Sequence, residues 1–125
     1  MASKAKSEAE TPFQVADCFK GQYRALLAQF PEIADTIETF NRNKRTRPPT
    51  PLPAHMRDHK LDGRLKGVRE CHLAGDVLLL YEHKDDVVKL LYICHHEDLY
   101  GKRGKQLATR IGDLLKELAA KYPPK

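Results

Sequence analysis

Apolar residues recur at helical spacing in the first third of the chain. They lie three or four positions apart between Phe19 and Phe30, which predicts an amphipathic helix over residues 18–30. Pro31 ends this helix, and a second apolar stripe predicts another helix that runs to about residue 42. Residues 12–16 alternate between apolar and polar side chains. These patterns together predict a short edge strand followed by a helical hairpin.

The pattern changes to that of strands in the second half of the chain. Three segments rich in apolar residues are Arg64–Leu73, Val77–Tyr81 and Val87–Cys94. The segments between them, Ala74–Asp76 and His83–Asp86, are short and rich in turn-forming residues. Such short connections are typical of antiparallel neighbours, so we expect a three-stranded antiparallel meander.

A third apolar stripe, from Leu107 to Leu118, predicts a final helix over residues 102–121. The resulting order of elements is typical of an α+β fold. We expect a small sandwich in which an antiparallel sheet is packed by the N-terminal helical hairpin and the C-terminal helix. This single domain would span residues 11–122 and follow a disordered tail at residues 1–10. With the helices on one face, the other face of the sheet would be free to carry a site.

Composition and motifs exclude several classes of protein. The chain has 125 residues, of which 41% are hydrophobic, and a net charge of +5, which favours an anionic partner. The sequence holds no apolar run long enough to span a membrane and no apolar segment near the N-terminus that would suggest a secretory signal. Three cysteines do not suit a disulfide framework and fit a reducing cytoplasm. Glycine-rich nucleotide-binding motifs and the HExxH metalloprotease motif are absent from the sequence.

Histidines gather around the ends of the predicted strands. The first strand of the meander carries His72 at its end, and the turn that follows leads to Asp76 at the start of the second meander strand. The third strand returns antiparallel to the second, so its end, at Cys94–His96, should lie near Asp76. The topology therefore predicts a cluster of histidine and aspartate side chains at one edge of the sheet.

Three interpretations of this cluster stay open from the residues alone. The histidines can be solvated or hydrogen-bonded structural residues. They can bind zinc together with Cys71 and Cys94, although adjacent residues on a strand point to opposite faces and so converge on one ion with difficulty. They can also catalyse cleavage of RNA, in which the 2′-OH is the nucleophile. That reaction needs a base, an acid and nearby cations, and histidine can do both proton transfers near neutral pH.

Five ordered segments of the chain resemble the core of the YafQ branch of the RelE-superfamily toxins. They are Asp58–Gly63, Lys66–His72, Gly75–Asp76, Leu78–Tyr81 and His95–Gly101. The resemblance covers about residues 13–101 and implies a RelE-like fold, to which residues 102–121 add a helix.

The resemblance also implies an activity. Proteins of this family are the ribonuclease components of type II toxin–antitoxin pairs. We therefore expect a cytoplasmic, ribosome-dependent endoribonuclease, or mRNA interferase, that cleaves mRNA by metal-independent acid–base chemistry. The implied partners are the 70S ribosome with its mRNA and a cognate antitoxin, a small acidic DNA-binding protein. The resemblance implies no cofactor, no metal and no membrane.

The resemblance also implies site residues, at the positions of this sequence that match the motifs of the family. The implied catalytic residues are His59, His72, Asp76 and His96. His96 is the expected acid for the leaving oxygen, and Asp76 or His59 takes the 2′-OH proton or orients the group that does. The implied substrate-binding residues are Arg57, Lys66, Arg69, Lys89 and Tyr100, of which Tyr100 would stack on a base. The family usually carries an arginine at the position of Tyr92, so Arg57, Arg69 or Lys89 would have to supply that charge.

The connector between the helical hairpin and the sheet is basic and stiffened by prolines. We expect exposed cations there to bind phosphates of RNA or of the ribosome. The candidates are Lys44, Arg45, Arg47, Lys60 and Arg64. Two other functions stay open: a catalytically weak RelE-fold protein that binds RNA or the ribosome, and a basic DNA-binding module, which lacks a helix-turn-helix signal in this sequence.

Overall fold

The computed structural model describes residues 10–123. The disordered tail predicted for residues 1–10 lies outside this range apart from Glu10. The strands are β1 (Phe13–Val15), β2 (His59–Lys60), β3 (Arg69–Ala74), β4 (Val77–Lys84) and β5 (Val87–His95). The helices are α2 (Asp17–Gln29), α3 (Ile33–Arg45), α4 (His96–Tyr100) and α5 (Gly104–Lys121). Two short 3₁₀ helices, η1 (Ala54–Met56) and η2 (Gly63–Leu65), flank β2.

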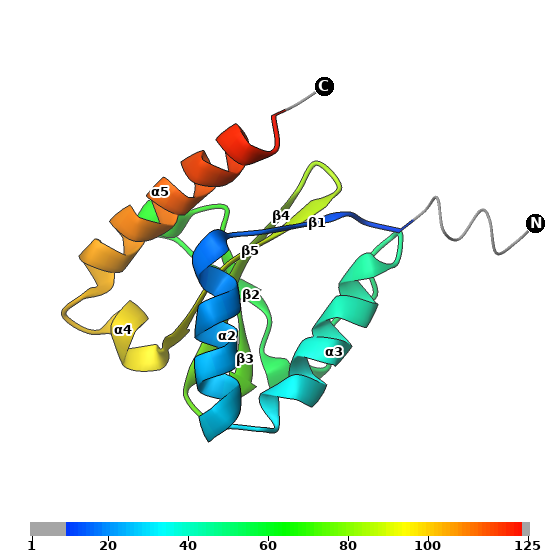
Figure 1. Cartoon of the computed structure of the whole chain (residues 1–125), viewed down its shortest axis with the longest axis horizontal. Helices are drawn as coiled ribbons and strands as arrows, with labels where there is room; N and C mark the ends of the chain where they lie inside the picture. Colours follow the sequence, from blue (N-terminus) through cyan, green and yellow to red (C-terminus); the bar gives the residue numbers. More distant parts are fainter. Residues whose placement is uncertain (1–9, 124–125) are drawn as a thin grey trace, which may run out of the picture.

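The strands form one five-stranded sheet in the order β1-β5-β4-β3-β2. β1 is parallel to β5, and the other neighbours are antiparallel. The predicted edge strand, helical hairpin, meander and final helix are therefore confirmed, and so is the α+β class (Figure 1). The first meander strand begins at Arg69 instead of Arg64, because residues 63–65 form η2 and Gly67, with a φ of 99°, turns the chain before β3. β2 is a short edge strand beyond the predicted meander, and it carries His59 into the sheet.

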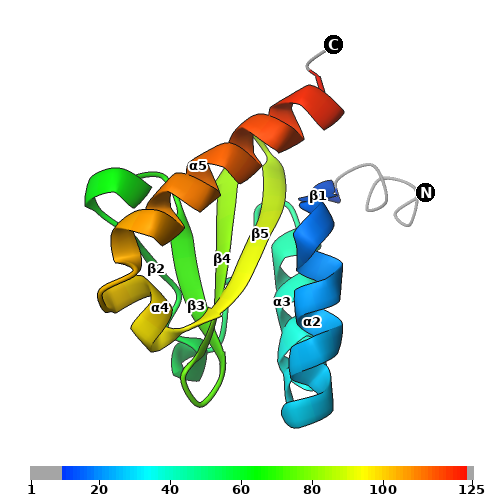
Figure 2. The same cartoon turned by 60° about the vertical axis from the view of Figure 1, so that its left-hand side comes forward.

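Helices cover both faces of the sheet (Figure 2). α2 and α3 pack on one face, where Phe40, Leu79 and Tyr81 belong to one buried cluster. α5 crosses the other face, where Leu114 and Leu80 belong to a second buried cluster. The expectation that one face would stay free is therefore wrong. The apolar stripe of α5 has to be buried, and the apolar side chains that the strands present on that face supply the surface.

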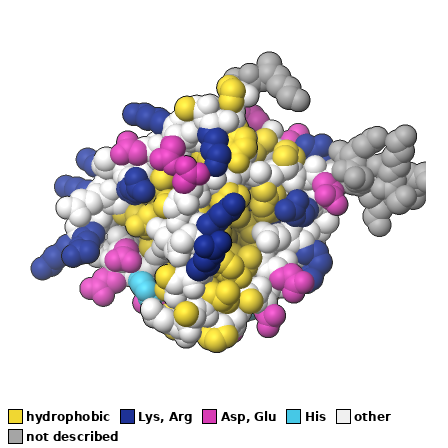
Figure 3. Space-filling model, in the orientation of Figure 1, with side chains coloured by type: hydrophobic (Ala, Val, Ile, Leu, Met, Phe, Trp, Pro, Cys, Tyr) yellow, Lys and Arg dark blue, Asp and Glu magenta, His cyan; other side chains and the backbone are white. Residues whose placement is uncertain are grey.

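The helical hairpin presents apolar side chains on the outside of the molecule as well. Tyr23, Leu26 and Leu27 of α2 and Phe30 after it are only partly buried against the sheet. Figure 3 shows apolar side chains gathered across the middle of this face, with charged side chains mainly around them. Of the helices within residues 10–123, none combines the length and apolar character needed to cross a bilayer.

The basic connector is tied to the sheet by a charged network. Helix α3 continues to Arg45, further than predicted, and this buries the side chain of Lys44, which is 8% exposed. Lys44 Nζ lies 3.6 Å from Asp58 Oδ2, and both Arg69 and Tyr81 donate hydrogen bonds to Asp58. Because Asp58 directly precedes His59, this network positions the segment that carries His59.

Candidate functional site

His59 and Glu70 form the centre of the candidate site. They are paired across β2 and β3, and the His59 ring is about half exposed, whereas Glu70 is 2% exposed. His59 Nε2 lies 2.8 Å from Glu70 Oε1, and His59 Nδ1 lies 2.7 Å from the carbonyl oxygen of Arg57. Both ring nitrogens therefore face oxygen acceptors. The two contacts hold the His59 ring in one orientation beside the buried carboxyl group.

Tyr100 and His96 extend this contact series on helix α4. The Tyr100 hydroxyl donates a hydrogen bond of 2.5 Å to Glu70 Oε1, and the ring centroids of His96 and Tyr100 are 4.4 Å apart. Burial of the hydroxyl, together with its hydrogen bond to Glu70 and the charge there, raises the pKa of Tyr100. The hydroxyl therefore stays a donor at neutral pH, and the exposed ring of Tyr100 is held beside His96.

Asp76 lies at the same end of β5 but contacts the neighbouring histidine. Gly75, with a positive φ of 49°, closes the turn that precedes Asp76. The Asp76 carboxylate lies 3.1 Å from His95 Nδ1, and the backbone N–H of His96 donates to the Asp76 carbonyl at 2.8 Å. The structure thus brings Asp76 next to His96 through the backbone, while its side chain is paired with His95.

His72 lies on the same side of β3 as Glu70, two residues further along the strand. Its side chain is half-buried, and its backbone pairs with that of Leu78 on β4. Exposed cations surround the site at the edge of the sheet: Arg57 precedes β2, Lys60 ends β2, and Arg64 and Lys66 lie in and after η2. Lys60 also lines a cavity of about 350 Å³ together with His59 and Tyr100.

Two of the predicted substrate-binding cations lie away from this site. Arg69 pairs with Tyr81 across β3 and β4, and the Tyr81 side chain is buried under α2 and α3. The Arg69 guanidinium donates hydrogen bonds to Asp58 on this face of the sheet, which is opposite to the face that carries Glu70. Lys89 forms an ion pair of 3.3 Å with Glu82 near the start of β5, whereas His96 follows the end of that strand. Neither side chain is directed at the contact series of His59, Glu70, Tyr100 and His96.

The five predicted RNA-binding cations divide into exposed and buried residues. Arg45, Arg47, Lys60 and Arg64 are exposed. The expectation that Lys44 is exposed is wrong, because its ammonium is enclosed by Asp58 and by the Tyr81 ring, whose centroid lies 5.2 Å away. Lys44 therefore belongs to the core of the fold.

The thiols of the zinc interpretation are buried. Burial, with nearby negative charge, raises the pKa of Cys71 well above its usual range and that of Cys94 to about 12. Cys71 belongs to the buried cluster under α2 and α3 and Cys94 to the buried cluster under α5, so the two thiols lie on opposite faces of the sheet and do not converge on one ion. Within residues 10–123, no group of three or more His, Cys, Asp or Glu side chains is placed to hold a metal ion.

Sequence reasoning missed Glu70, the residue that joins His59 to Tyr100. A signal for it exists in the sequence, because an acid interrupts a segment otherwise predicted to be a half-buried strand. Charged side chains are rarely fully buried without a partner. The signal does not identify that partner, since His59 and Tyr100 are 11 and 30 positions away from Glu70.

Comparison with known proteins identifies the family. Residues 12–101 match the family model of the bacterial toxin YafQ of type II toxin–antitoxin systems. The mRNA interferase toxin YafQ of Escherichia coli is 37% identical over 51 residues, which are 41% of this chain and 55% of that protein. A relative from Haemophilus influenzae is 48% identical over 33 residues, 26% of this chain and 32% of the relative. The matched segments thus span about half or less of these curated relatives.

Solved structures share the fold over most of the chain. A copper-bound mutant toxin from Helicobacter pylori is 29% identical, with a TM-score of 0.57, and the match covers 72% of this chain and 99% of that one. YafQ in the E. coli DinJ–YafQ toxin–antitoxin complex is 21% identical, with a TM-score of 0.58 and coverage of 74% and 99%. The family match covers well over half of the sequence. This chain therefore belongs to the YafQ toxin family of type II toxin–antitoxin systems.

Proposed function

We propose that this toxin is an endoribonuclease that cleaves mRNA on the ribosome by acid–base chemistry without a metal ion. The observation that carries the proposal is the contact series from His59 through Glu70 and Tyr100 to His96 at one edge of the sheet. It places two exposed imidazoles beside an exposed aromatic ring. The name of the E. coli relative, an mRNA interferase, supports the same activity.

The proposed reaction uses the 2′-OH of the RNA as the nucleophile. The O2′–P bond forms and the P–O5′ bond breaks, so one proton leaves O2′ and another is delivered to O5′. His96 is the proposed acid for O5′, since its ring is exposed and within residues 10–123 forms no side-chain hydrogen bond. His95 is the proposed base that takes the proton from O2′, and Asp76 orients it through the contact with His95 Nδ1.

His59 has a different proposed role from the one that the resemblance implies. Because both of its ring nitrogens face acceptors, His59 is suited to carry a positive charge rather than to remove a proton. Such a charge next to the reacting phosphate stabilises the negative charge that develops there. Lys60, Arg57 and Arg64 add positive charge at the same edge.

Replacement of His96 by Gln tests this activity. We expect cleavage of ribosome-bound message to fall by about 10²–10⁴-fold, the contribution typical of a general acid, while thermal unfolding and ribosome co-sedimentation stay unchanged. The matched control is His55→Gln, which removes an exposed histidine from η1. A chelator selective for transition metals, added with Mg²⁺ kept constant for the ribosome, should leave wild-type cleavage intact.

Two outcomes would contradict the proposal. Full cleavage by His96→Gln would assign the proton transfer to another residue. Arrest of translation by the wild type without cut message would favour the alternative of a catalytically weak protein that binds the ribosome. The proposed cytoplasmic partners are the ribosome, which the co-sedimentation assay tests, and a cognate antitoxin. In a strain whose growth the toxin arrests, co-expression of the adjacent antitoxin reading frame should restore growth.

A further inference from the structure

A pocket lies between α5 and β5, outside the contact series of the candidate site. Its volume is about 290 Å³, and it is lined by Tyr92, Asp98, Arg103, Gln106, Leu107 and Arg110. Arg103 directly precedes α5, and Gln106 and Arg110 lie on it, at a spacing that places the three polar side chains on one face of the helix. The matched family segment ends at residue 101, so these three side chains come from outside it.

The pocket shares a sheet face with the candidate site. His59 pairs with Glu70, Glu70 with Leu80, and Leu80 with Tyr92, so these four residues form one row across the sheet. Neighbouring strands lie about 4.8 Å apart, which separates the backbones of Glu70 and Tyr92 by roughly 10 Å. Leu80 in this row is buried under α5, but the pocket shares Asp98 and Arg103 with a second cavity that Asp76 and His95 line, so a chain of nucleotides bound at the candidate site can reach the pocket along the surface of α4.

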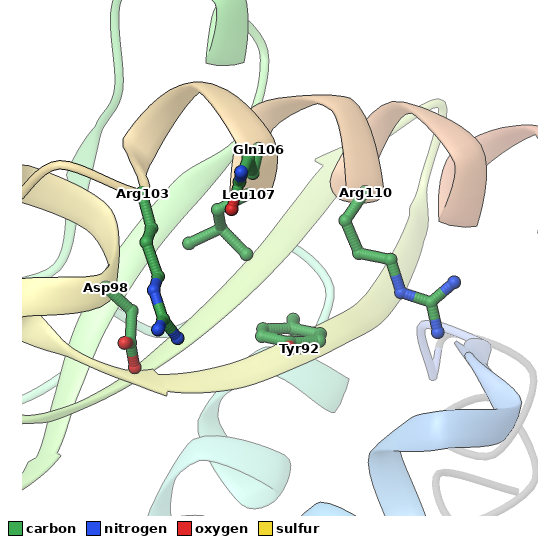
Figure 4. Close-up of a pocket in the computed structure, with 6 residues that line it drawn as sticks. All are labelled: Tyr92, Asp98, Arg103, Gln106, Leu107 and Arg110. Atoms are coloured by element: carbon green, nitrogen blue, oxygen red, sulfur yellow. The ribbon is translucent and has the colours of Figure 1, made fainter.

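The side chains in the pocket suit an anionic ligand with an aromatic ring. Figure 4 shows the Tyr92 ring on the floor, with Arg103, just before α5, and Arg110, on α5, reaching down on its two sides. Among residues 10–123, neither arginine has a carboxylate within ion-pair distance. Asp98 also lines the pocket, but one of its carboxylate oxygens accepts the backbone N–H of His95 at the start of α4.

We propose that this pocket binds a nucleotide of single-stranded RNA next to the one that is cleaved. Tyr92 would stack on the base, Arg103 and Arg110 would bind the phosphates through their guanidinium groups, and the Gln106 amide is placed to contact the base edge. The inference rests on the proposed function, because it assigns a second part of the same RNA substrate to α5.

Binding of an uncleavable RNA to the full chain tests the proposal. The probe is a trinucleotide with methylated 2′-oxygens, which lacks the nucleophile of the cleavage reaction. In NMR titrations of the wild type, we expect saturable shifts of the Arg103 and Arg110 Nε–H and Gln106 amide signals, and an upfield shift of the Tyr92 ring protons. Ribose 5-phosphate should bind at least about tenfold more weakly, because it has no base to stack.

Charge-matched variants separate the pocket from general electrostatics. Arg103→Gln with Arg110→Gln should weaken trinucleotide binding at least about tenfold. Lys105→Gln with Lys116→Gln removes the same charge from exposed positions of α5 and should change it less than about twofold. Equal weakening by both pairs would overturn the pocket as a site, and so would the absence of shifts in the pocket of the wild type.

The test of RNA binding in the pocket is independent of the test of RNA cleavage. If His96→Gln abolishes cleavage while the pocket signals never respond to RNA, the pocket proposal is wrong and the proposed function stands. If the pocket binds the trinucleotide but the wild type cleaves no message, the proposed activity is wrong and the RNA-binding site stands. Binding of ribose 5-phosphate as tight as that of the trinucleotide would overturn the assignment of Tyr92 as a stacking platform.

Discussion

The Nε2 atom of His59 lies 2.8 Å from Oε1 of Glu70, a carboxylate that is 2% exposed. The second oxygen of this carboxylate, Oε2, is buried and within residues 10–123 has no hydrogen-bond partner. A buried carboxylate depends on hydrogen bonds and on a neighbouring positive charge for its stability. The exposed imidazole and the buried acid therefore act as one unit, and His59 is held in place by a residue that the solvent does not reach.

This unit predicts that substitutions at the two positions are not additive. His59→Gln should lower cleavage about 10²-fold, the loss typical of one group that stabilises developing charge, and Glu70→Gln should lower it at least about tenfold, because the amide removes the charge that positions His59. The double variant should lose little more than His59→Gln alone. Single-turnover cleavage of ribosome-bound message measures all three rates. Losses that multiply in the double variant would show that Glu70 acts independently of His59.

The Asp58 network predicts a dependence of stability on acid. Burial raises the pKa of Asp58, but hydrogen bonds from Arg69 and Tyr81 and the charges of Lys44 and Arg69 outweigh it and hold the pKa below its ordinary value of 3.8. A carboxyl group with a lowered pKa in the folded state contributes stability above its ordinary value and loses that contribution as the pH falls through the folded value. The free energy of unfolding should therefore fall below about pH 4.

Asp58→Asn should cost about 3–5 kcal/mol at pH 7, because Lys44 then stays buried without its negative partner. The variant should also lose less stability than the wild type on acidification. Urea denaturation between pH 2 and pH 7 measures both effects, and Asp62→Asn, at an exposed position, is the control. Parallel pH curves for the wild type and Asp58→Asn would exclude Asp58 as the source of the acid sensitivity.

Helix α5 is predicted to be an integral part of the fold. Leu114 is fully buried against the sheet, so Leu114→Ala should lower the free energy of unfolding by about 2–5 kcal/mol. Leu115, which is only partly buried, provides the control, and Leu115→Ala should cost clearly less. Denaturant unfolding followed by circular dichroism gives both values. An unchanged stability of Leu114→Ala would mean that α5 is detached from the sheet in solution.

The exposed cations of the connector predict a salt-dependent affinity for ribosomes. Arg45→Gln with Arg47→Gln should flatten the dependence of the logarithm of the binding constant on the logarithm of salt concentration by about 0.7 for each phosphate that these arginines neutralise in the wild type. Lys44 is left intact because its replacement would disturb the core. Ribosome co-sedimentation over a range of KCl concentrations gives the slopes. The control pair, Lys20→Gln with Arg24→Gln on α2, should leave the slope unchanged, and an equal effect would point to net charge alone.

Periodicity alone was sufficient for α2, α3 and α5, for the meander and for the α+β class, but it did not predict the five-residue helix α4. The apolar stripes that became α2, α3 and α5, and the turn signals before β4 and β5, are local features. Each depends on contacts between residues that are close in sequence. The candidate site residues His59 and His96 came from the resemblance of short segments, which are local features as well.

Long-range packing decided the rest. The sequence alone does not show that α5 crosses the second face of the sheet, that the last turns of α3 bury Lys44, or that Glu70 lies between His59 and Tyr100. Each of these depends on strand register and on the way helices cover the sheet. A shift of β3 by one residue would turn Glu70 to the opposite face and bring Arg69 in its place, because successive side chains on a strand alternate between the two faces.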